Sequence, residues 1–207
     1  MKKDFSAVRL CVLVTGRLSP LPFETLVGEV AAGGADCIQL REKGLPDREL
    51  LERARLGREL AGEAIFIVND RADVALLSGA DGVHLGRGDL PVEEARRLLG
   101  EDAIIGASAS SQDEIRAAER AGADYLGVGC VYPTATRDKE PGGLELVRRA
   151  AAAASVPFLA IGGITAENAG DVARAGAPGV AVCSAVISSG DPRDAAAAVR
   201  RAFLAGR

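Results

Sequence analysis

The sequence predicts a (β/α)₈ barrel formed by a single domain over residues 1–207. Two observations lead to this fold. A phrase ending in Gly-Ala-Asp or Gly-Ala-Pro follows an amphipathic helical pattern and precedes a short apolar run at residues 33–36, 78–81, 121–124 and 175–178. Further apolar runs and helical patterns alternate between these copies, so that eight strand–helix units fit in 207 residues. That number of units in one domain is typical of a closed parallel barrel.

Four strands follow the repeated phrase directly, and we expect them at 37–40, 82–85, 125–128 and 179–183. The other four are apolar runs at 9–15, 64–68, 103–107 and 157–161. As a set they are rich in Val, Ile and Ala, which favours parallel strands covered on both faces. An open, doubly wound sheet is the alternative. It fits less well because the polar residues are not concentrated at one glycine-rich turn.

The helices between these strands are expected at 22–32, 46–62, 70–79, 91–100, 111–122, 143–154, 165–176 and 192–205. Several begin with a start signal, namely Pro46-Asp47, Pro91, Ser111, Thr165 and Asp191-Pro192. The Gly of each repeated phrase would end the preceding helix in a left-handed conformation. The Asp residues of the phrase, Asp36, Asp81 and Asp124, precede their strands. They are interpreted as caps on the stability face of the barrel and not as ligands.

Composition excludes several classes of protein. Apolar residues make up 48% and aromatic residues 3%, so the core is aliphatic, and the net charge of −4 argues against a nucleic-acid-binding surface. No apolar run approaches the roughly 20 residues that a membrane helix needs. The start of the chain is a poor secretion signal, and the four cysteines show no metal-type spacing. We therefore expect a cytoplasmic protein with reduced cysteines that binds neither membrane nor nucleic acid.

Two cations and an amide follow the second strand. Gln39, Arg41 and Lys43 alternate along the chain, so they share one face at the end of that strand. Converging cations of this kind favour an anionic ligand. A solvated strand end with salt bridges to Glu42 or Asp36 explains the same pattern, and these residues alone do not decide between the two.

The other unusual residues also follow strands, on the rim where such barrels carry their chemistry. Asp70 follows the third strand and Asp89 lies in the loop after the fourth. Each alone could cap the next helix. Together, near Arg41 and Lys43, they form a candidate Mg²⁺ site that bridges to a phosphate. His84 could point into the barrel mouth, although a hydrogen-bonded core histidine fits its position equally well.

A second anion site is expected after the last two strands. Gly162-Gly163 ends the seventh strand and Ser184 the eighth, where many such barrels bind phosphate through backbone N–H groups. Tight packing is the alternative explanation for the two glycines. The loop over residues 132–141 is long enough to close over both anion sites.

Taken together, these segments resemble thiamine phosphate synthase over nearly the whole chain. The resemblance is carried by residues 39–43, 67–70, 82–89, 105–108, 129–137, 160–164 and 181–186. It implies a (β/α)₈ transferase of thiamine biosynthesis that joins hydroxymethylpyrimidine diphosphate to a thiazole phosphate and releases diphosphate. It also implies a dissociative mechanism with Mg²⁺ as cofactor, and it leaves a homo-oligomer open.

The resemblance implies a role for each matching residue. The diphosphate would contact Arg41, Lys43, Asn69 and Ser108, of which Arg41, Lys43 and Ser108 would be catalytic. The metal would be bound by Asp70 and Asp89, and Gln39 would face the aminopyrimidine. The thiazole phosphate would contact Thr134, Thr136, Arg137, Gly162, Gly163, Ser184 and Ala185.

The sequence departs from the family pattern at Val12, Arg87, Gly88, Ser110 and Arg137. Lysine is usual in place of Arg137, and a histidine is frequent in place of Ser110. The closest rival is a thiazole tautomerase, which would require that histidine. A non-catalytic barrel that binds phosphorylated ligands is a second rival, and an unrelated phosphosugar isomerase is a third, because fold alone does not determine function.

Overall fold

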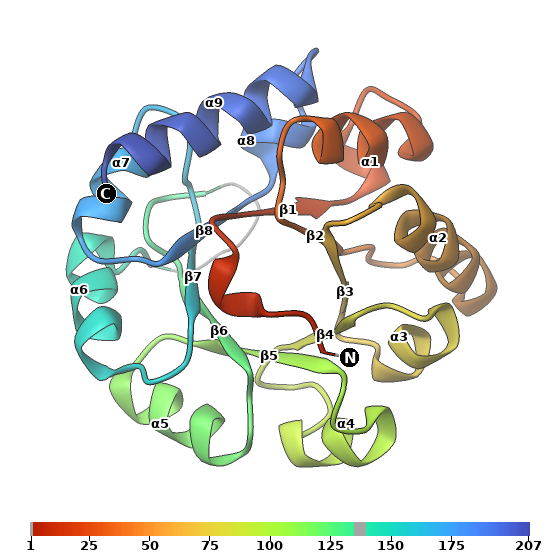
Figure 1. Cartoon of the computed structure of the whole chain (residues 1–207), viewed down its shortest axis with the longest axis horizontal. Coiled ribbons are helices and arrows are strands. Elements are labelled where there is room, and N and C mark those ends of the chain that lie inside the picture. The colour runs from red at the N-terminus through yellow and green to blue at the C-terminus, as the bar shows by residue number, and fades with distance from the viewer. Residues whose placement is uncertain (1, 135–139) are drawn as a thin grey trace.

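The computed structural model describes residues 2–134 and 140–207. Within these residues, eight parallel strands form a closed barrel in which β8 pairs with β1. The strands are β1 (Leu10–Val14), β2 (Cys37–Leu40), β3 (Ile65–Asn69), β4 (Gly82–Leu85), β5 (Ile104–Ala109), β6 (Tyr125–Gly129), β7 (Phe158–Ile161) and β8 (Gly179–Val182). The predicted fold is confirmed, and Figure 1 shows the helices surrounding the barrel.

The helices are α1 (Phe23–Ala32), α2 (Asp47–Leu60), α3 (Ala72–Ser78), α4 (Val92–Leu99), α5 (Gln112–Arg120), α6 (Gly143–Ala153), α7 (Ala169–Arg174), α8 (Ser184–Ile187) and α9 (Pro192–Ala205). Two of them differ from the sequence prediction. The seventh begins at Ala169 and not near 165, because Thr165 N donates to Asn168 Oδ1 at 2.8 Å and closes a turn first. A short helix, α8, follows β8 before the expected last helix.

The glycines of the repeated phrase end their helices as predicted. The φ angles are 87° at Gly34, 68° at Gly79, 90° at Gly122 and 101° at Gly176. Side chains with a Cβ rarely adopt such angles, so these positions favour glycine. The phrase therefore recurs because each helix must turn back toward the barrel in the same way.

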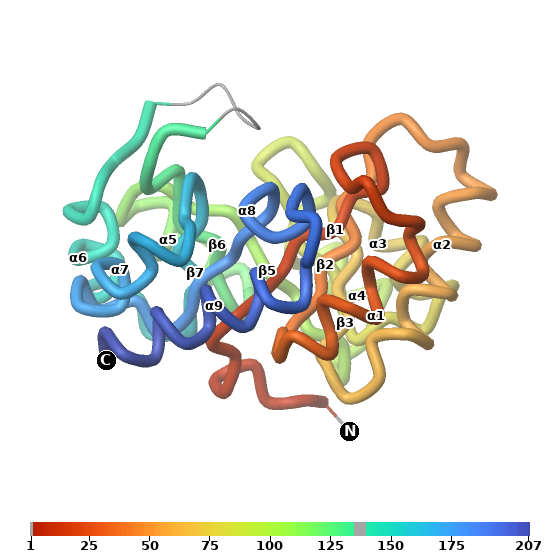
Figure 2. Tube along the Cα trace, turned by 90° about the horizontal axis from the view of Figure 1, so that it is seen from above, coloured from red at the N-terminus to blue at the C-terminus, as the bar shows by residue number. Residues whose placement is uncertain are grey.

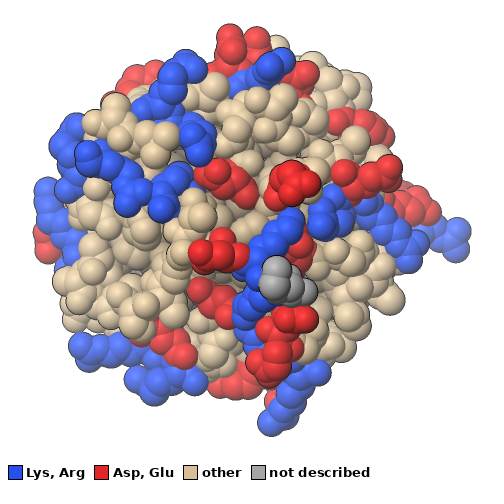
Figure 3. Space-filling view, in the orientation of Figure 1, with Lys and Arg blue, Asp and Glu red and all other residues tan. Residues whose placement is uncertain are grey.

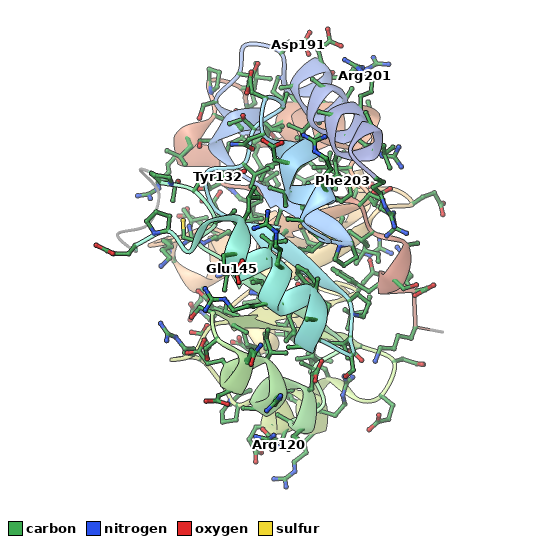
Figure 4. All side chains as sticks on the ribbon, turned by 90° about the vertical axis from the view of Figure 1, so that its left-hand side faces the viewer. Arg120, Tyr132, Glu145, Asp191, Arg201 and Phe203 are labelled. Atoms are coloured by element: carbon green, nitrogen blue, oxygen red, sulfur yellow. The ribbon has the colours of Figure 1, made fainter. Side chains whose placement is uncertain are left out.

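Alternate side chains of the strands fill two separate cores. The barrel interior contains an apolar cluster that includes Cys11, Leu13, Cys37, Ile65 and Ile67. The outer strand faces pack against the helices in a second and larger cluster. Helix α9 presents one face to this outer core: Phe203 is fully buried, whereas Arg201 lies on the exposed side (Figure 4).

Aromatic rings fill the lower part of the barrel interior. The ring of Phe5, from the short turn η1 (Phe5–Ala7), stacks on the ring of Tyr125 with centroids 3.8 Å apart. A Cβ at Gly106 would lie 2.2 Å from the Tyr125 ring, and a Cβ at Gly127 would lie 2.9 Å from His84. These two strand positions are glycine because the interior has no room for a side chain beside Tyr125 and His84.

The Asp residues of the repeated phrase tie strands together at the N-terminal face. Asp36 accepts from the backbone N–H of Leu10, Asp81 from that of Phe66, and Asp124 from that of Ile105, at 2.8–3.0 Å. Each also contacts a cation, and acidic and basic side chains lie close together near the centre of this face (Figure 3). Their structural role is confirmed, although they accept from N–H groups in the first two residues of strands and not of helices.

The N-terminal segment and the predicted functional residues lie at opposite ends of the barrel. Figure 2 shows residues 2–7 at the lower end, whereas the chain on either side of residues 135–139 lies at the upper end. Lys2 and Lys3 hold the segment in place through Asp124 and Asp81, at 2.6 and 3.1 Å. In the part of the chain that the structure describes, no helix combines the length and apolar character needed to cross a bilayer.

Candidate active site

A cavity of about 540 Å³ occupies the upper part of the barrel, at the C-terminal ends of the strands. Its volume is within the range of small-molecule sites. The predicted site residues that line it are Gln39, Arg41, Asn69, Ser108, Thr134, Gly162, Gly163, Ser184 and Ala185. The barrel thus brings together residues that are up to 146 positions apart in the sequence.

The remaining predicted residues fall into two groups. Lys43, Asp70 and Asp89 do not line the cavity among its described residues, but Asp70 interacts with both Lys43 and Asp89 and with the cavity residue Arg41. Thr136 and Arg137 lie outside the described residues.

The end of β2 directs its polar residues as the alternation predicts. Gln39 is buried and faces the cavity, and Arg41 lies two residues further along the same face. Glu42 turns the other way: it accepts from Gly16 N at 2.8 Å and pairs with Arg53 at 2.5 Å, with 4% of its side chain exposed. Glu42 is therefore committed to anchoring the loop after β1 and to Arg53.

The charge of Arg41 acts across the cavity mouth. Burial raises the pKa of Asp70, which follows β3, and that of Cys183, which follows β8, and in both cases the charge of Arg41 acts in the opposite direction. A guanidinium that influences groups on both sides of a cavity is well placed to bind an anion held there.

Asp70 and Asp89 form a carboxylate pair at the rim. Asp70 is half-buried, and burial, a hydrogen bond with Asp89 and the charge of Asp89 raise its pKa from 3.8 to about 6, although Lys43 and Arg41 act in the opposite direction. Its φ of 66° is a conformation that few residues other than glycine adopt. Two carboxylates held so close repel each other unless a proton or a cation lies between them.

Neither carboxylate caps a helix. Arg71 occupies the N-cap of α3 and Pro91 that of α4, and neither helix has a side-chain cap. Asp89 Oδ2 instead accepts from Gly86 N at 2.6 Å within its own loop. The alternative interpretation of these two residues as helix caps is therefore wrong.

The pair fits a magnesium ion. Magnesium is commonly held by one or two carboxylates, with the remaining positions taken by water and substrate oxygens. Among the described residues, no three His, Cys, Asp or Glu side chains gather in a metal-binding cluster, and the fit is judged on these two carboxylates alone. Their oxygen donors and mutual repulsion suit a hard divalent cation that is completed by a phosphate ligand.

His84 lies inside the barrel and contacts the cavity. Its Nδ1 is 3.1 Å from the hydroxyl of Tyr125, and its Nε2 is 3.0 Å from Ser108 Oγ. Both sequence interpretations of His84 therefore hold, since the ring is hydrogen-bonded at both nitrogens and also lines the mouth.

The Gly162-Gly163 turn lies against the start of the loop after β6. Both residues have positive φ, 108° and 63°, and a Cβ at Gly162 would lie 2.5 Å from Cys130 Sγ. Packing therefore requires glycine here whether or not a ligand binds. The same turn lines the cavity beside Ser184 and Ala185, the first residues of α8, so its backbone is accessible from the cavity.

Several cavity residues were not identified as site residues from the sequence. Arg87 pairs with Glu114 at 2.9 Å, and Glu114 accepts from Ser110 N and Oγ at 2.6 and 2.8 Å. These three residues form one wall of the cavity. The sequence departs from the family pattern at Arg87 and at Ser110, and both residues contact Glu114. These two departures were the signal that could have located this wall.

Comparisons with known proteins agree on one family. Residues 11–186 match the family described as TMP-TENI, thiamine monophosphate synthase. The thiamine-phosphate synthase of Moorella thermoacetica is 48% identical over 203 residues, which cover 96% of this chain and 97% of that protein. That of Chlorobium luteolum is 50% identical over 191 residues, covering 90% and 89%. A solved thiamine phosphate pyrophosphorylase from Pyrococcus furiosus is 41% identical, covers 97% and 98% of the two chains, and superposes with a TM-score of 0.89.

Proposed function

The chain belongs to the thiamine monophosphate synthase family of transferases, and from this premise we propose its reaction. It condenses 4-amino-2-methyl-5-hydroxymethylpyrimidine diphosphate with a thiazole phosphate, giving thiamine phosphate and diphosphate. The observation that carries this proposal is the grouping of Arg41, Lys43, Asp70 and Asp89 at one side of the cavity mouth. Such a group suits a metal-complexed diphosphate, because it combines two cations with two carboxylates that can hold Mg²⁺.

The departing diphosphate is held at the ends of β2, β3 and β5. Arg41 and Lys43 offset its negative charge, while Asn69 and the Ser108 hydroxyl donate hydrogen bonds to its oxygens. Asp70 and Asp89 would hold Mg²⁺, which would neutralise further charge on the leaving group. These interactions strengthen as the carbon–oxygen bond breaks. They therefore lower the activation free energy of bond cleavage, in addition to tightening substrate binding.

The reaction needs no side-chain nucleophile. Loss of diphosphate leaves a pyrimidine methyl cation, which the thiazole nitrogen then traps, so the protein must stabilise the leaving group and hold the second reactant in line. Gln39 faces the aminopyrimidine from the cavity wall. Each 1.4 kcal/mol of additional transition-state stabilisation raises the rate about tenfold.

The thiazole phosphate binds on the opposite side of the mouth. Thr134 and the backbone at Gly162, Gly163, Ser184 and Ala185 surround its phosphate. Backbone N–H groups hold a phosphate without a full countercharge, so the two anions of the reaction occupy different subsites. Substrates held at the two subsites would then face each other with the thiazole nitrogen toward the pyrimidine methylene.

A thiazole tautomerase is less consistent with the site. That reaction would require a histidine in place of Ser110, and Ser110 is hydrogen-bonded to Glu114 at the cavity wall. A tautomerase would also have no use for the carboxylate pair. A barrel that only binds phosphorylated ligands would not release diphosphate, and this difference makes it testable.

The test is a coupled assay of diphosphate release with both substrates and Mg²⁺. We expect turnover that requires the metal and both substrates, and we expect Asp89→Ala to abolish it while the protein stays folded. Glu52→Ala, an exposed carboxylate on α2, is the matched control and should not change the rate. Binding without diphosphate release in the unmodified protein would exclude the synthase reaction.

A further inference from the structure

A chain of contacts connects the lower end of the barrel with the cavity. Phe5 stacks on Tyr125 with an interplanar angle of 15°, the Tyr125 hydroxyl lies 3.1 Å from His84 Nδ1, and His84 Nε2 lies 3.0 Å from Ser108 Oγ. Only Ser108 of these residues has been assigned a contact with substrate. The other members therefore need an explanation of their own.

The direction of the hydrogen bonds follows from Tyr125. This residue is 2% exposed, and its hydroxyl hydrogen needs an acceptor because an unsatisfied buried donor is costly. Among the described residues, the hydrogen-bond partner of that hydroxyl is His84 Nδ1. Burial raises the pKa of Tyr125 well above its ordinary value, so the phenol keeps its proton. Tyr125 therefore donates to Nδ1, and Nδ1 carries no hydrogen.

The tautomer of His84 then determines what Ser108 does. A neutral ring without a hydrogen on Nδ1 carries it on Nε2, so Nε2–H donates to Ser108 Oγ. With Oγ accepting from His84, the hydrogen of the Ser108 hydroxyl is left to point into the cavity. The opposite tautomer would let Ser108 donate to Nε2 instead, and its hydroxyl would then offer lone pairs to an anionic oxygen.

We propose that Tyr125 and His84 are positioning residues that hold the Ser108 hydroxyl as a hydrogen-bond donor to the departing diphosphate. This proposal rests on the function proposed above. Gly106 and Gly127 hold the two rings in place, because each leaves only the space that the adjacent ring fills. Phe5 closes the lower side of Tyr125, so the hydrogen-bond chain is shielded from water at the end that faces away from the cavity.

The tautomer can be measured directly. His84 is the only histidine in the sequence, so protein with ¹⁵N-labelled histidine gives one pair of ring-nitrogen signals. We expect a neutral ring with hydrogen on Nε2 in the unmodified protein, and a mixture of tautomers in Tyr125→Phe. A hydrogen on Nδ1 in the unmodified protein, or an unchanged tautomer in the variant, would overturn the proposal.

Kinetic measurements test whether the hydrogen bonds between Tyr125, His84 and Ser108 matter for the reaction. Tyr125→Phe keeps the ring and its packing but no longer holds the Ser108 hydroxyl as a donor. We expect kcat to fall about tenfold with KM little changed, because this hydrogen bond stabilises the negative charge that develops on the diphosphate in the transition state. Ser78→Ala removes a hydroxyl at the end of α3, away from the cavity, and should have no such effect. Equal kcat values for Tyr125→Phe and the unmodified enzyme would contradict the proposal.

A double-mutant cycle separates positioning from general damage. If Tyr125 acts only through Ser108, Tyr125→Phe costs nothing further in a Ser108→Ala background. Additive losses would show that Tyr125 acts in another way. If the unmodified protein released no diphosphate at all, the proposed function would fail, whereas the ring-nitrogen signals would still decide the direction of the hydrogen-bond chain.

Discussion

Replacing Asp70 with asparagine should stabilise the protein in the absence of metal, and it should abolish the Mg²⁺-dependent activity. The pKa of Asp70 is raised from 3.8 to about 6, chiefly by burial and by Asp89, so ionisation of Asp70 opposes folding. Because one pKa unit is worth about 1.4 kcal/mol, the rise corresponds to an upper limit of about 3 kcal/mol. Asp70 is only half-buried, and solvent screening reduces this to about 1 kcal/mol.

The sign of the pH dependence follows from the raised pKa. The protonated carboxyl is favoured in the folded state, so its contribution to stability is present below about pH 4 and is lost as the pH rises through about 6. Asparagine cannot ionise, and it tolerates a φ of 66° better than most residues. The difference in stability between Asp70→Asn and the unmodified protein should therefore be absent at pH 4 and complete at pH 8.

Thermal unfolding in EDTA at pH 4 and pH 8 measures this difference. For a chain of this length, about 1 kcal/mol raises Tm by about 2–4 °C. Mg²⁺ should then raise the Tm of the unmodified protein but not that of the variant, because the proposed metal site needs both carboxylates. Asp73→Asn is the matched control. The hydrogen bond from Arg71 lowers the pKa of Asp73, so the ionised carboxylate stabilises the folded state, and its replacement should lower Tm slightly at pH 8. A lower Tm for Asp70→Asn at pH 8 without metal would refute the reasoning.

Two further predictions concern the two ends of the barrel. Lys43→Ala should lower kcat at least tenfold, because it removes positive charge from the site of the leaving diphosphate. Arg201→Ala, on the exposed side of α9, should not lower it. Equal kcat values for the two variants in the diphosphate assay would contradict the role proposed for Lys43. Asp81→Ala removes the acceptor of Phe66 N, at 2.8 Å, and the partner of Lys3, so we expect urea denaturation to show a loss of about 2 kcal/mol in the free energy of unfolding. The kcat of Asp81→Ala should stay unchanged, since Asp81 lies at the end of the barrel away from the cavity, and an unaltered urea midpoint would argue against the strand-tying role.

The sequence alone determined the architecture. Helix endings at Gly34, Gly79, Gly122 and Gly176 and the apolar runs that follow them depend on local backbone geometry, which the residue pattern records directly. The shared face of Gln39 and Arg41 follows from the two-residue period of a strand in the same way. These features are local, so no knowledge of distant contacts was needed.

The tertiary structure decided which polar residues act together. Helix capping and metal binding were both open for Asp70 and Asp89, and the structure removed the first by pairing the two carboxylates across adjacent loops. The same holds for His84, whose two partners come from β5 and β6. Contacts of this kind depend on the stagger between neighbouring strands and on closure of the barrel. These global properties place side chains within hydrogen-bonding distance, and no spacing along the chain records them.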